Sequence, residues 1–346
     1  MTPKAPMGSS AQHSSPLSAS QRFTQALSLV PEIAEVEKTI RATFSSDVAA
    51  MREIPEYLLA LGGKRIRPIL TLLSAKALGA TSISRDIITV AAGIELIHMA
   101  TLMHDDIIDE SPIRRHKPSP YARYGTPLTL LSGDFLLTRA FGLCAKLDDE
   151  IIVATEQACI ELVEGEALET PLHIEPHTRA SSRTIAERKT ASLFRLAAFC
   201  ASHLTGADRP TTEALCTFGQ SLGVAFQFID DILDVLSDEA TLGKRPGLDI
   251  AERKPSLVNV LWLESGDAAA QRLLQPPHGD DEAQFVAQSL KTLTSGPVMD
   301  RAKSLAQQDA LNAADALRQG LGEERSQSPE GQALFSVIDF ALERML

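Results

Sequence analysis

The chain has 346 residues, a formal net charge of −12, 44% hydrophobic residues and 23% charged residues. This balance is ordinary for a globular protein, and its sign is opposite to the basic face that nucleic-acid-binding proteins present, so no nucleic-acid partner is expected. The sequence contains no run of about 18 apolar residues, so no transmembrane segment is expected.

The N-terminal region differs in composition from the remainder. Residues 1–20 are rich in Ser, Pro and Ala and lack the apolar core of a secretory signal. We therefore expect a disordered tail over 1–20, followed by a single all-helical domain over 21–346. Apolar residues at helical spacing predict a helix within 20–47.

Glycine and proline divide the next segments. Pro55 is suited to open a short helix that stops at Gly62-Gly63, and Pro68 fits the first turn of another helix. The segment from Asp86 to Asp109 is apolar almost all round, which is typical of a buried helix.

Further helices are expected over 133–147 and 150–169. Thr184 and Glu187 form a possible capping box for a helix that runs to about Leu204. The segment Thr217–Leu236 is again nearly apolar throughout. No strand pattern of useful length occurs, so the predicted fold class is all-α.

Two aspartate-rich segments end the two apolar helices. They are Asp105-Asp106-Ile107-Ile108-Asp109 and Asp230-Asp231-Ile232-Leu233-Asp234. Burying several unpaired carboxylates is costly, and residues four apart on a helix share a face. Hard oxygen ligands of this kind suit magnesium, which prefers one or two carboxylates together with water and substrate phosphates. A solvated helix end explains one such cluster as well, but two of the same form favour a metal site.

Positive residues accompany the acidic clusters. The segment Gly62-Gly63-Lys64-Arg65-Ile66-Arg67-Pro68 places three cations at a glycine turn before a helix. Arg114 and Arg115 follow the first cluster, and Lys244 and Lys254 follow the second. Helix starts and arginine side chains favour phosphate groups, so the sequence indicates a diphosphate as the partner of the metal.

The 4 cysteines are scattered through apolar helical stretches and form no zinc or redox motif. Buried, reduced thiols in a cytoplasmic protein are the expected interpretation.

These segments resemble the trans-prenyl diphosphate synthase (polyprenyl synthetase) family, and in particular its medium- and long-chain members. The resemblance covers about residues 55 to 260 and rests on the following stretches: GGKRIRP at 62–68, HMATLMHDDIIDESPIRR at 98–115, GD at 133–134, KT at 189–190, FQFIDDILD at 226–234, LGK at 242–244 and ERKPS at 252–256.

The resemblance implies an isoprenoid-synthase-type helical bundle around a central cavity, in a homodimer. It implies that isopentenyl diphosphate and an allylic diphosphate condense head to tail to give an all-trans polyprenyl diphosphate, of the kind used in quinone side chains. It also implies about three magnesium ions per active site, each held in the manner that this ion prefers.

Site residues follow from the resemblance, position by position. The metal ligands would be Asp105, Asp106, Asp109, Asp230, Asp231 and Asp234. The allylic diphosphate would contact Arg114, Lys189, Thr190, Gln227, Lys244 and Lys254. Isopentenyl diphosphate would contact Lys64, Arg67, His98 and Arg115. The residues expected to bear most directly on catalysis are Asp105, Asp109, Asp230, Lys189 and Arg114.

Some positions depart from the family pattern. His116 stands where Gly is common, and Ser256 stands where Thr is frequent. Where many members carry a Gln after a Gly-Glu, this chain has Gly165-Glu166-Ala167-Leu168-Glu169-Thr170. Ala100 and Thr101 lie about one helical turn before Asp105, where the resemblance to the family implies that bulky aromatic residues would stop chain growth. Their small size predicts a product longer than geranylgeranyl.

Three alternatives stay open. The first is a geranylgeranyl- or farnesyl-type synthase, which differs only in its product. The second is a non-catalytic partner subunit, although such subunits tend to lose the acidic or basic residues that this chain retains. The third is a terpene cyclase, against which the second aspartate cluster and the GGKRIRP segment argue.

Overall fold

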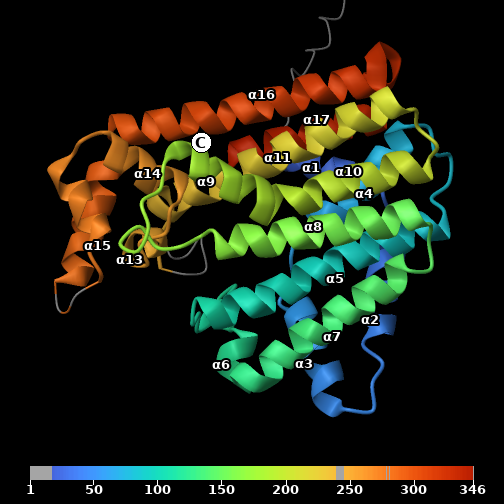
Figure 1. Cartoon of the computed structure of the whole chain (residues 1–346). Coiled ribbons are helices and arrows are strands. Elements are labelled where there is room, and N and C mark those ends of the chain that lie inside the picture. The colour runs from blue at the N-terminus through green and yellow to red at the C-terminus, as the bar shows by residue number, and fades with distance from the viewer. Residues whose placement is uncertain (1–17, 239–244, 278, 280, 346) are drawn as a thin grey trace, which may run out of the picture.

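The computed structural model describes residues 18–238, 245–277, 279 and 281–345, and nearly all of this part of the chain is helical, as predicted (Figure 1). The N-terminal half contains α1 (Ala19–Leu27), α2 (Ile33–Thr43), α3 (Ala49–Ala60), α4 (Ile66–Ala77), α5 (Arg85–Ile108), β1 (Ile113–Arg114), β2 (Lys117–Pro118), α6 (Pro120–Tyr124), α7 (Thr126–Cys144) and α8 (Asp149–Ala167). The C-terminal half contains α9 (Arg179–Ile185), η1 (Ala186–Ala191), α10 (Ser192–Leu204), α11 (Arg209–Leu236), α13 (Leu248–Ala251), α14 (Leu257–Glu264), η2 (Ala268–Leu274), α15 (Glu282–Leu293), α16 (Pro297–Ser326) and α17 (Pro329–Glu343).

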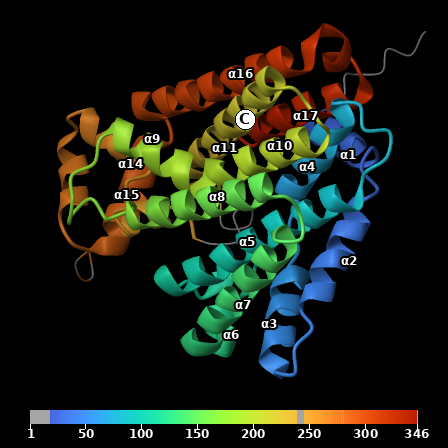
Figure 2. The ribbon, with the colours of Figure 1, turned by 45° about the vertical axis from the view of Figure 1, so that its right-hand side comes forward.

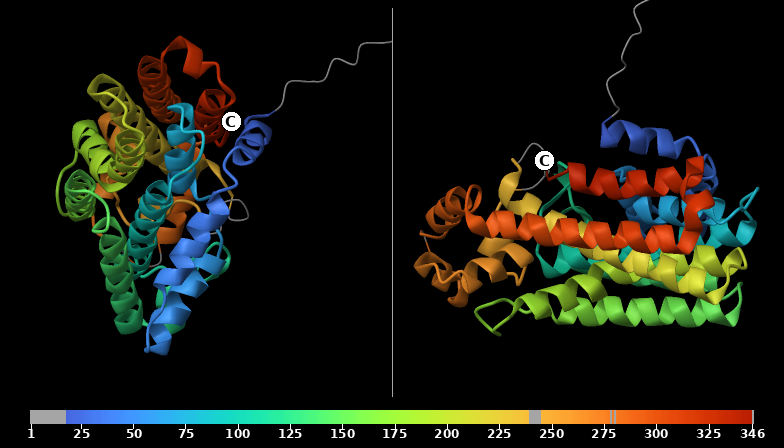
Figure 3. Two further views of the ribbon diagram at one scale, coloured as in Figure 1. Left: turned by 90° about the vertical axis from the view of Figure 1, so that its right-hand side faces the viewer. Right: turned by 90° about the horizontal axis from the view of Figure 1, so that it is seen from above.

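Two long helices organise the bundle. α5 packs against α2, α4, α7 and α10, whereas α11 packs against α10 and α16. Seen from above, α8, α11 and α16 run along a common direction, with α15 at one end of the molecule (Figure 3). The turned view shows α2, α3, α6 and α7 extending from one side of the bundle (Figure 2).

α5 is a core helix. The Ser84 side chain accepts a hydrogen bond from the amide of Ile87 at its N-terminus. By length and hydropathy α5 is also long and apolar enough to cross a membrane, but 67% of its most apolar stretch is buried inside the protein. Burial on nearly every side explains why its sequence shows no polar stripe.

The apolar core comprises two clusters, one around α4, α5 and α10 and one around the end of α11, α14 and α16. Phe226 and Leu342 pack against both clusters. All four cysteines are free thiols, with Cys144 and Cys200 buried. That residues 21–346 fold as one domain stays a prediction.

Several predicted boundaries were wrong. The region 20–47 contains two helices, because the chain turns between Leu27 and Ile33 around Pro31, which has no amide hydrogen to continue a helix. α1 begins at Ala19, within the expected tail, while residues 1–17 of that tail lie outside the described part of the chain.

Pro55 lies inside α3, which begins at Ala49, and does not open a helix. The N-terminal cap before α9 is Thr178 with Ser181, which exchange hydrogen bonds as a capping box, whereas Thr184 and Glu187 lie inside the helical segment. The described residues also contain one two-residue antiparallel pair, in which β1 and β2 are joined by the turn Arg115-His116.

Candidate active site

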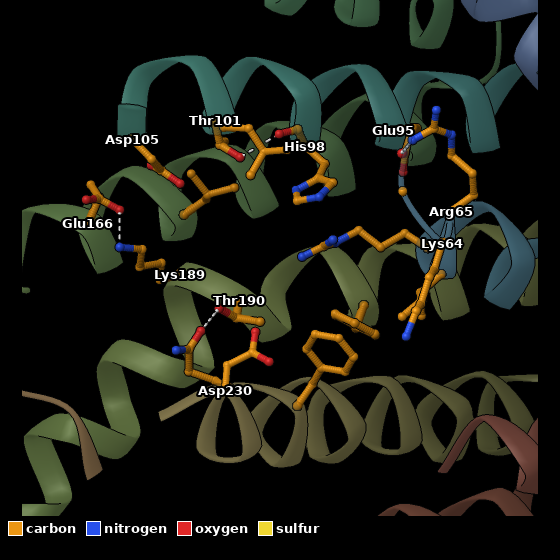
Figure 4. A pocket seen from close by; sticks show the side chains of 18 of the residues that line it. Lys64, Arg65, Glu95, His98, Thr101, Asp105, Glu166, Lys189, Thr190 and Asp230 are labelled. Carbon is orange, nitrogen blue, oxygen red and sulfur yellow. Dashed lines mark hydrogen bonds and ion pairs between the residues drawn. The ribbon is translucent and has the colours of Figure 1, made fainter. Parts of the chain in front are cut away.

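A cavity of about 760 Å³ opens between the ends of α5 and α11. Its walls come from the glycine turn before α4 and from α5, α8, η1, α10 and α11 (Figure 4). The predicted site residues that line it are Lys64, Arg67, His98, Thr101, Asp105, Arg115, Lys189, Thr190, Gln227 and Asp230. The fold therefore brings both aspartate clusters and both groups of cations to one cavity.

Asp105 and Asp230 mark the acidic end of this cavity. They project from α5 and α11, which form opposite walls (Figure 4). Burial raises the pKa of Asp105 to about 7, although the nearby Lys189 ammonium opposes this shift. A carboxylate whose ionised form is disfavoured by burial is a place where a cation is stabilising.

Lys189 is held beside Asp105 by two glutamates. Its Nζ lies 2.8 Å from Glu166 Oε2 and 2.5 Å from Glu169 Oε2. Lys189 and the next residue, Thr190, belong to η1, a π-helical turn between α9 and α10. Such widened turns occur often at functional sites because they redirect side chains out of the regular helical register.

A chain of hydrogen bonds orients the wall formed by α11. Thr190 Oγ1 donates to Gln227 Oε1 at 2.5 Å, and Gln227 Nε2 donates to Asp231 Oδ1 at 2.8 Å. Asp231 Oδ2 accepts the amide of Leu257 at 2.8 Å. Burial, with Asp249 nearby, raises the pKa of Asp231 well above its usual range. Asp231 is thereby a buried anchor for Gln227 and for the start of α14.

The opposite end of the cavity is cationic and is built on the glycine turn. Gly63 has a φ of 139°, and a Cβ atom there would meet the guanidinium groups of Arg65 and Arg115. Arg65 forms ion pairs with Glu37 at 3.1 Å and with Glu95 at 3.3 Å, so it holds the turn in place. Arg115 donates to the carbonyl of Gly62.

Besides Arg115, three further predicted phosphate ligands lie at this end. Lys64 Nζ is 4.1 Å from the Phe340 ring centroid, and the Arg67 guanidinium is 4.8 Å from that of Phe194. Burial lowers the pKa of Arg67 to about 10, and its buried Nε has no hydrogen-bond partner among the described residues. Burial, with Arg67 and Arg114 nearby, holds the pKa of His98 well below its ordinary value, so its ring is neutral at pH 7.

This arrangement suits magnesium if the substrate completes the coordination of the ion. Asp105 and Asp230 offer hard oxygen ligands from opposite walls, and the described residues contain no group of three or more His, Cys, Asp or Glu side chains arranged as a metal site. Magnesium characteristically takes one or two carboxylates and fills its remaining positions with water and phosphate oxygens. The donor set is therefore consistent with an ion that binds together with a diphosphate.

Comparison with known proteins decides the family. Residues 48–293 match the polyprenyl synthetase family model. The chain belongs to the polyprenyl synthetase family. This confirms the predicted family and the prediction of a prenyltransferase, and the all-α isoprenoid-synthase-type fold is confirmed by the solved structures it resembles.

Individual polyprenyl synthetases resemble the chain over most of its length. An octaprenyl diphosphate synthase of Haemophilus influenzae is 33% identical over 317 residues, which is 91% of this chain and 94% of that protein. An all-trans-nonaprenyl-diphosphate synthase (geranyl-diphosphate specific) of Rhodobacter capsulatus is 34% identical over 316 residues, which is 91% of this chain and 95% of that protein. The crystal structure of a polyprenyl synthase from Caulobacter crescentus CB15, complexed with calcium and isoprenyl diphosphate, superposes with a TM-score of 0.86 at 30% identity, covering 94% of this chain and 98% of that one.

Some predicted residues of this polyprenyl synthetase do not line the cavity. Asp106 is buried, and Arg114 Nη2 and Nε lie 2.8 and 2.9 Å from its Oδ1. Asp109 Oδ1 lies 3.0 Å from Lys254 Nζ. Asp234 is buried and accepts the amide of Asp249 at 3.1 Å. Their roles as ligands stay predictions.

Two other predicted residues need separate comment. Ala100 is fully buried beside the cavity-lining Thr101, so only Thr101 of the expected chain-length pair borders the cavity. Lys244 lies outside the described residues.

Backbone strain gathers around the site of this polyprenyl synthetase. The described residues other than glycine with positive φ are Arg65, Glu110, Arg115, His116 and Arg253. Each of them is at, or next to, a residue that was predicted to bind metal or diphosphate. Such conformations persist only where their surroundings impose them, and they cluster at functional sites.

The structure adds residues that the motifs did not reveal. Arg344, directly after α17, lines the cavity, and its Nη2 lies 2.8 Å from Asp230 Oδ1. Leu162 and Phe194 supply apolar wall, together with Phe226, the first residue of the FQFIDDILD stretch. Arg344 stands far from every quoted motif in the sequence, so no local pattern could have indicated it.

Proposed function

We propose that this polyprenyl synthetase condenses isopentenyl diphosphate with an allylic diphosphate, head to tail, to give an all-trans polyprenyl diphosphate. The observation that carries the proposal is the division of one cavity into two ends. Asp105, Asp230 and Lys189 lie toward one end, and Lys64 lies at the other, on the glycine turn that leads into α4 and Arg67 (Figure 4). Two diphosphates need separate subsites, and this charge distribution provides them.

The acidic end suits the allylic substrate. Magnesium, held by Asp105 and Asp230 and present as about three ions, would stabilise negative charge on the departing diphosphate. The Lys189 ammonium would orient the same phosphates, and the Thr190 hydroxyl, which donates to Gln227 in this structure, would donate to them after turning away from Gln227. Preorganised donors of this kind act where charge develops as the allylic C–O bond breaks.

The cationic end suits isopentenyl diphosphate. Lys64, Arg67 and Arg115 would bind its phosphates, and the neutral His98 ring would donate one hydrogen bond. The double bond then attacks the allylic carbon, and a proton leaves the product. Glu95 lines this end but is paired with Arg65, so the released diphosphate is the better proton acceptor.

Product length is proposed to exceed geranylgeranyl. Thr101 borders the cavity and Ala100 is small, so no bulky aromatic side chain stands about one helical turn before Asp105. Relatives named octaprenyl and nonaprenyl diphosphate synthase favour the same conclusion. A geranylgeranyl product is the second candidate, because a relative of Methanosarcina mazei with that name is 30% identical over 298 residues. A long product is suited to a quinone side chain.

A homodimer is proposed through α7 and α8, in the cytoplasm. These neighbouring helices expose Leu128, Leu130, Leu131, Phe141, Val153, Ile160 and Val163. Exposed apolar side chains gathered in this way are typical of an interface. Light scattering should give twice the chain mass, and Ile160→Lys combined with Val163→Lys should shift it toward one chain mass.

Replacement of the two cavity aspartates tests the proposed chemistry. Asp105→Ala and Asp230→Ala should each lower turnover by at least about a hundredfold, because each removes a ligand that acts on the departing diphosphate. Glu56→Ala, which removes an exposed carboxylate from the ion pair with Arg41, is the control and should leave turnover unchanged. Turnover near that of the unmodified enzyme in both cavity variants would refute the assignment.

A further inference from the structure

A buried arginine precedes one of the proposed diphosphate ligands. Arg253 lies between α13 and α14, has a φ of 61°, and its side chain is 0% exposed. Left-handed backbone in a residue other than glycine and a fully buried guanidinium are both unfavourable unless the surroundings compensate for them. The next residue is Lys254.

The side chain of Arg253 is anchored at every nitrogen. Nη1 and Nη2 donate to the two carboxylate oxygens of Glu282, at 2.7 and 3.0 Å, which is the bidentate geometry that arginine forms best. Nε donates to the Gln275 carbonyl at 3.1 Å, and Nη1 also donates to the Ile250 carbonyl at 2.6 Å. The anchor therefore joins the end of α13, the end of η2 and the start of α15.

The backbone around Arg253 is fixed as well. The Leu172 amide donates to the Arg253 carbonyl at 2.7 Å, which ties the segment to the connection between α8 and α9. The Lys254 amide donates to the Asp249 carbonyl at 2.9 Å, and Asn259 Nδ2 donates to the Lys254 carbonyl at 3.0 Å. Lys254 is thus held on both sides of its Cα atom.

The Lys254 side chain crosses from this anchored segment to the first aspartate cluster. Its Nζ lies 3.0 Å from Asp109 Oδ1 and 3.2 Å from Glu252 Oε2. Asp109 directly follows α5, so this ion pair joins the C-terminal helices to the end of the helix that carries Asp105, although neither Asp109 nor Lys254 itself lines the cavity. A small rotation of the Arg253 backbone would move this ammonium, because it lies at the end of a long side chain.

We propose that Arg253 is a positioning residue, which fixes Lys254 beside the acidic end of the cavity, next to Asp109, by anchoring its backbone to α15. The proposal rests on the proposed function, in which Lys254 binds the allylic diphosphate. Arg253 itself touches no substrate. It makes the placement of one active-site cation depend on Glu282, a residue of the C-terminal helices.

The first test is Arg253→Gly, which adopts the same φ without strain and removes the anchor. The KM for the allylic diphosphate should rise about tenfold, while the KM for isopentenyl diphosphate stays within about twofold. Glu282→Gln keeps the size of the partner and should raise the same KM about threefold, and it serves if Arg253→Gly fails to fold. Arg272→Gln is the matched control, since Arg272 is a more exposed arginine 3.7 Å from the same glutamate, and both KM values should stay unchanged.

A double-mutant cycle distinguishes a role of Arg253 in positioning Lys254 from a general loss of active-site structure. Lys254→Met alone should raise the allylic KM, and adding Arg253→Gly to it should raise that KM no further, because the two act through one ammonium. Additive losses, or equal losses for both substrates, would overturn the positioning role. An unchanged allylic KM in Lys254→Met would overturn the proposed role of Lys254 and this inference with it, whereas loss in Lys254→Met without loss in Arg253→Gly or Glu282→Gln would overturn this inference alone.

Discussion

The guanidinium of Arg344 lies 2.8 Å from the carboxylate of Asp230, across 114 positions of sequence. The guanidinium carbon of Arg344 lies 5.0 Å from the centroid of the Phe226 ring. Burial lowers the pKa of Lys64, and the positive charge of Arg344 lowers it further. The end of the chain therefore contributes a cation to the wall that carries the second aspartate cluster.

The first prediction concerns this cation. Arg344→Gln removes a charge that pairs with Asp230 and lies close enough to Lys64 to lower its pKa, so the KM for isopentenyl diphosphate should rise about tenfold, as expected for loss of one charge-assisted hydrogen bond. Initial rates at saturating allylic substrate measure it. Arg318→Gln, which removes an exposed arginine from α16, is the control and should leave this KM unchanged. An Arg344→Gln enzyme with an unaltered KM would place Arg344 outside the substrate site.

Placement of α17 itself depends on α1. The amides of Ala19 and Ser20 donate to the Glu343 carboxylate at 3.0 and 2.6 Å, and Phe23 stacks on Phe340 at 4.4 Å. Phe340 in turn lies under Lys64. The first described helix thus fixes the last one, which delivers Arg344 to the cavity.

The second prediction concerns product length. Thr101→Phe places an aromatic ring on the cavity wall, and Ala100→Phe places one directly beside it, so both should shorten the main product. Mass analysis of the dephosphorylated products measures the change. Thr89→Phe, at a half-buried position of the same helix that does not line the cavity, should leave the product unaltered. Products of unchanged length in both cavity variants would show that the limit on growth lies elsewhere.

The third prediction concerns the hairpin turn at Arg115-His116. His116 has a φ of 62°, a conformation that glycine adopts without strain, so His116→Gly should stabilise the protein by up to about 1 kcal/mol. Urea unfolding measures it. Lys117→Gly, in the neighbouring extended strand, should instead destabilise, because there the only effect is the greater freedom of the unfolded chain. Destabilisation by His116→Gly would show that the histidine side chain contributes more than the strain costs.

The fourth prediction is a pH dependence of stability. Burial raises the pKa of Asp309 to about 6, against the opposing effect of Arg183, whose Nη2 lies 2.7 Å away. The folded protein therefore binds this proton more tightly than the unfolded chain does, and stability is lost as the pH rises from about 4 through about 6.

Asp309→Asn removes this titration. Its stability relative to the unmodified protein should improve between pH 4 and pH 7 by at most about 3 kcal/mol, the equivalent of a shift of about two pKa units. Unfolding in urea at several pH values measures the difference. If the unmodified protein gained relative to the variant as the pH rose, attraction to Arg183 would outweigh burial.

The sequence was sufficient to predict the helical fold and many of the residues that line the cavity, because apolar helices and acidic ends leave clear local patterns. The aspartate clusters end α5 and α11 as expected. Within each cluster, however, the side chains diverge. Asp105 and Asp230 face the cavity, whereas Asp106 pairs with Arg114 and Asp231 anchors Leu257.

That division could not be predicted, since it depends on partners from other segments. The roles of Arg344 and Arg253 could not be predicted for the same reason. One is brought to the site by the last helix, and the other acts through a glutamate 29 residues further along the chain. Pro55 gave a wrong prediction for a different reason. Its residue type favours a helix start, but in the structure it is tolerated within α3.

The central claim is that this enzyme elongates an allylic diphosphate with isopentenyl diphosphate. Its most direct test incubates the purified chain with magnesium, labelled isopentenyl diphosphate and either geranyl, farnesyl or geranylgeranyl diphosphate, and identifies the products by mass. The account predicts linear all-trans polyprenyl diphosphates longer than geranylgeranyl, with no product when magnesium is withheld. Absence of elongation with every primer, or a cyclic hydrocarbon in place of a longer diphosphate, would contradict it.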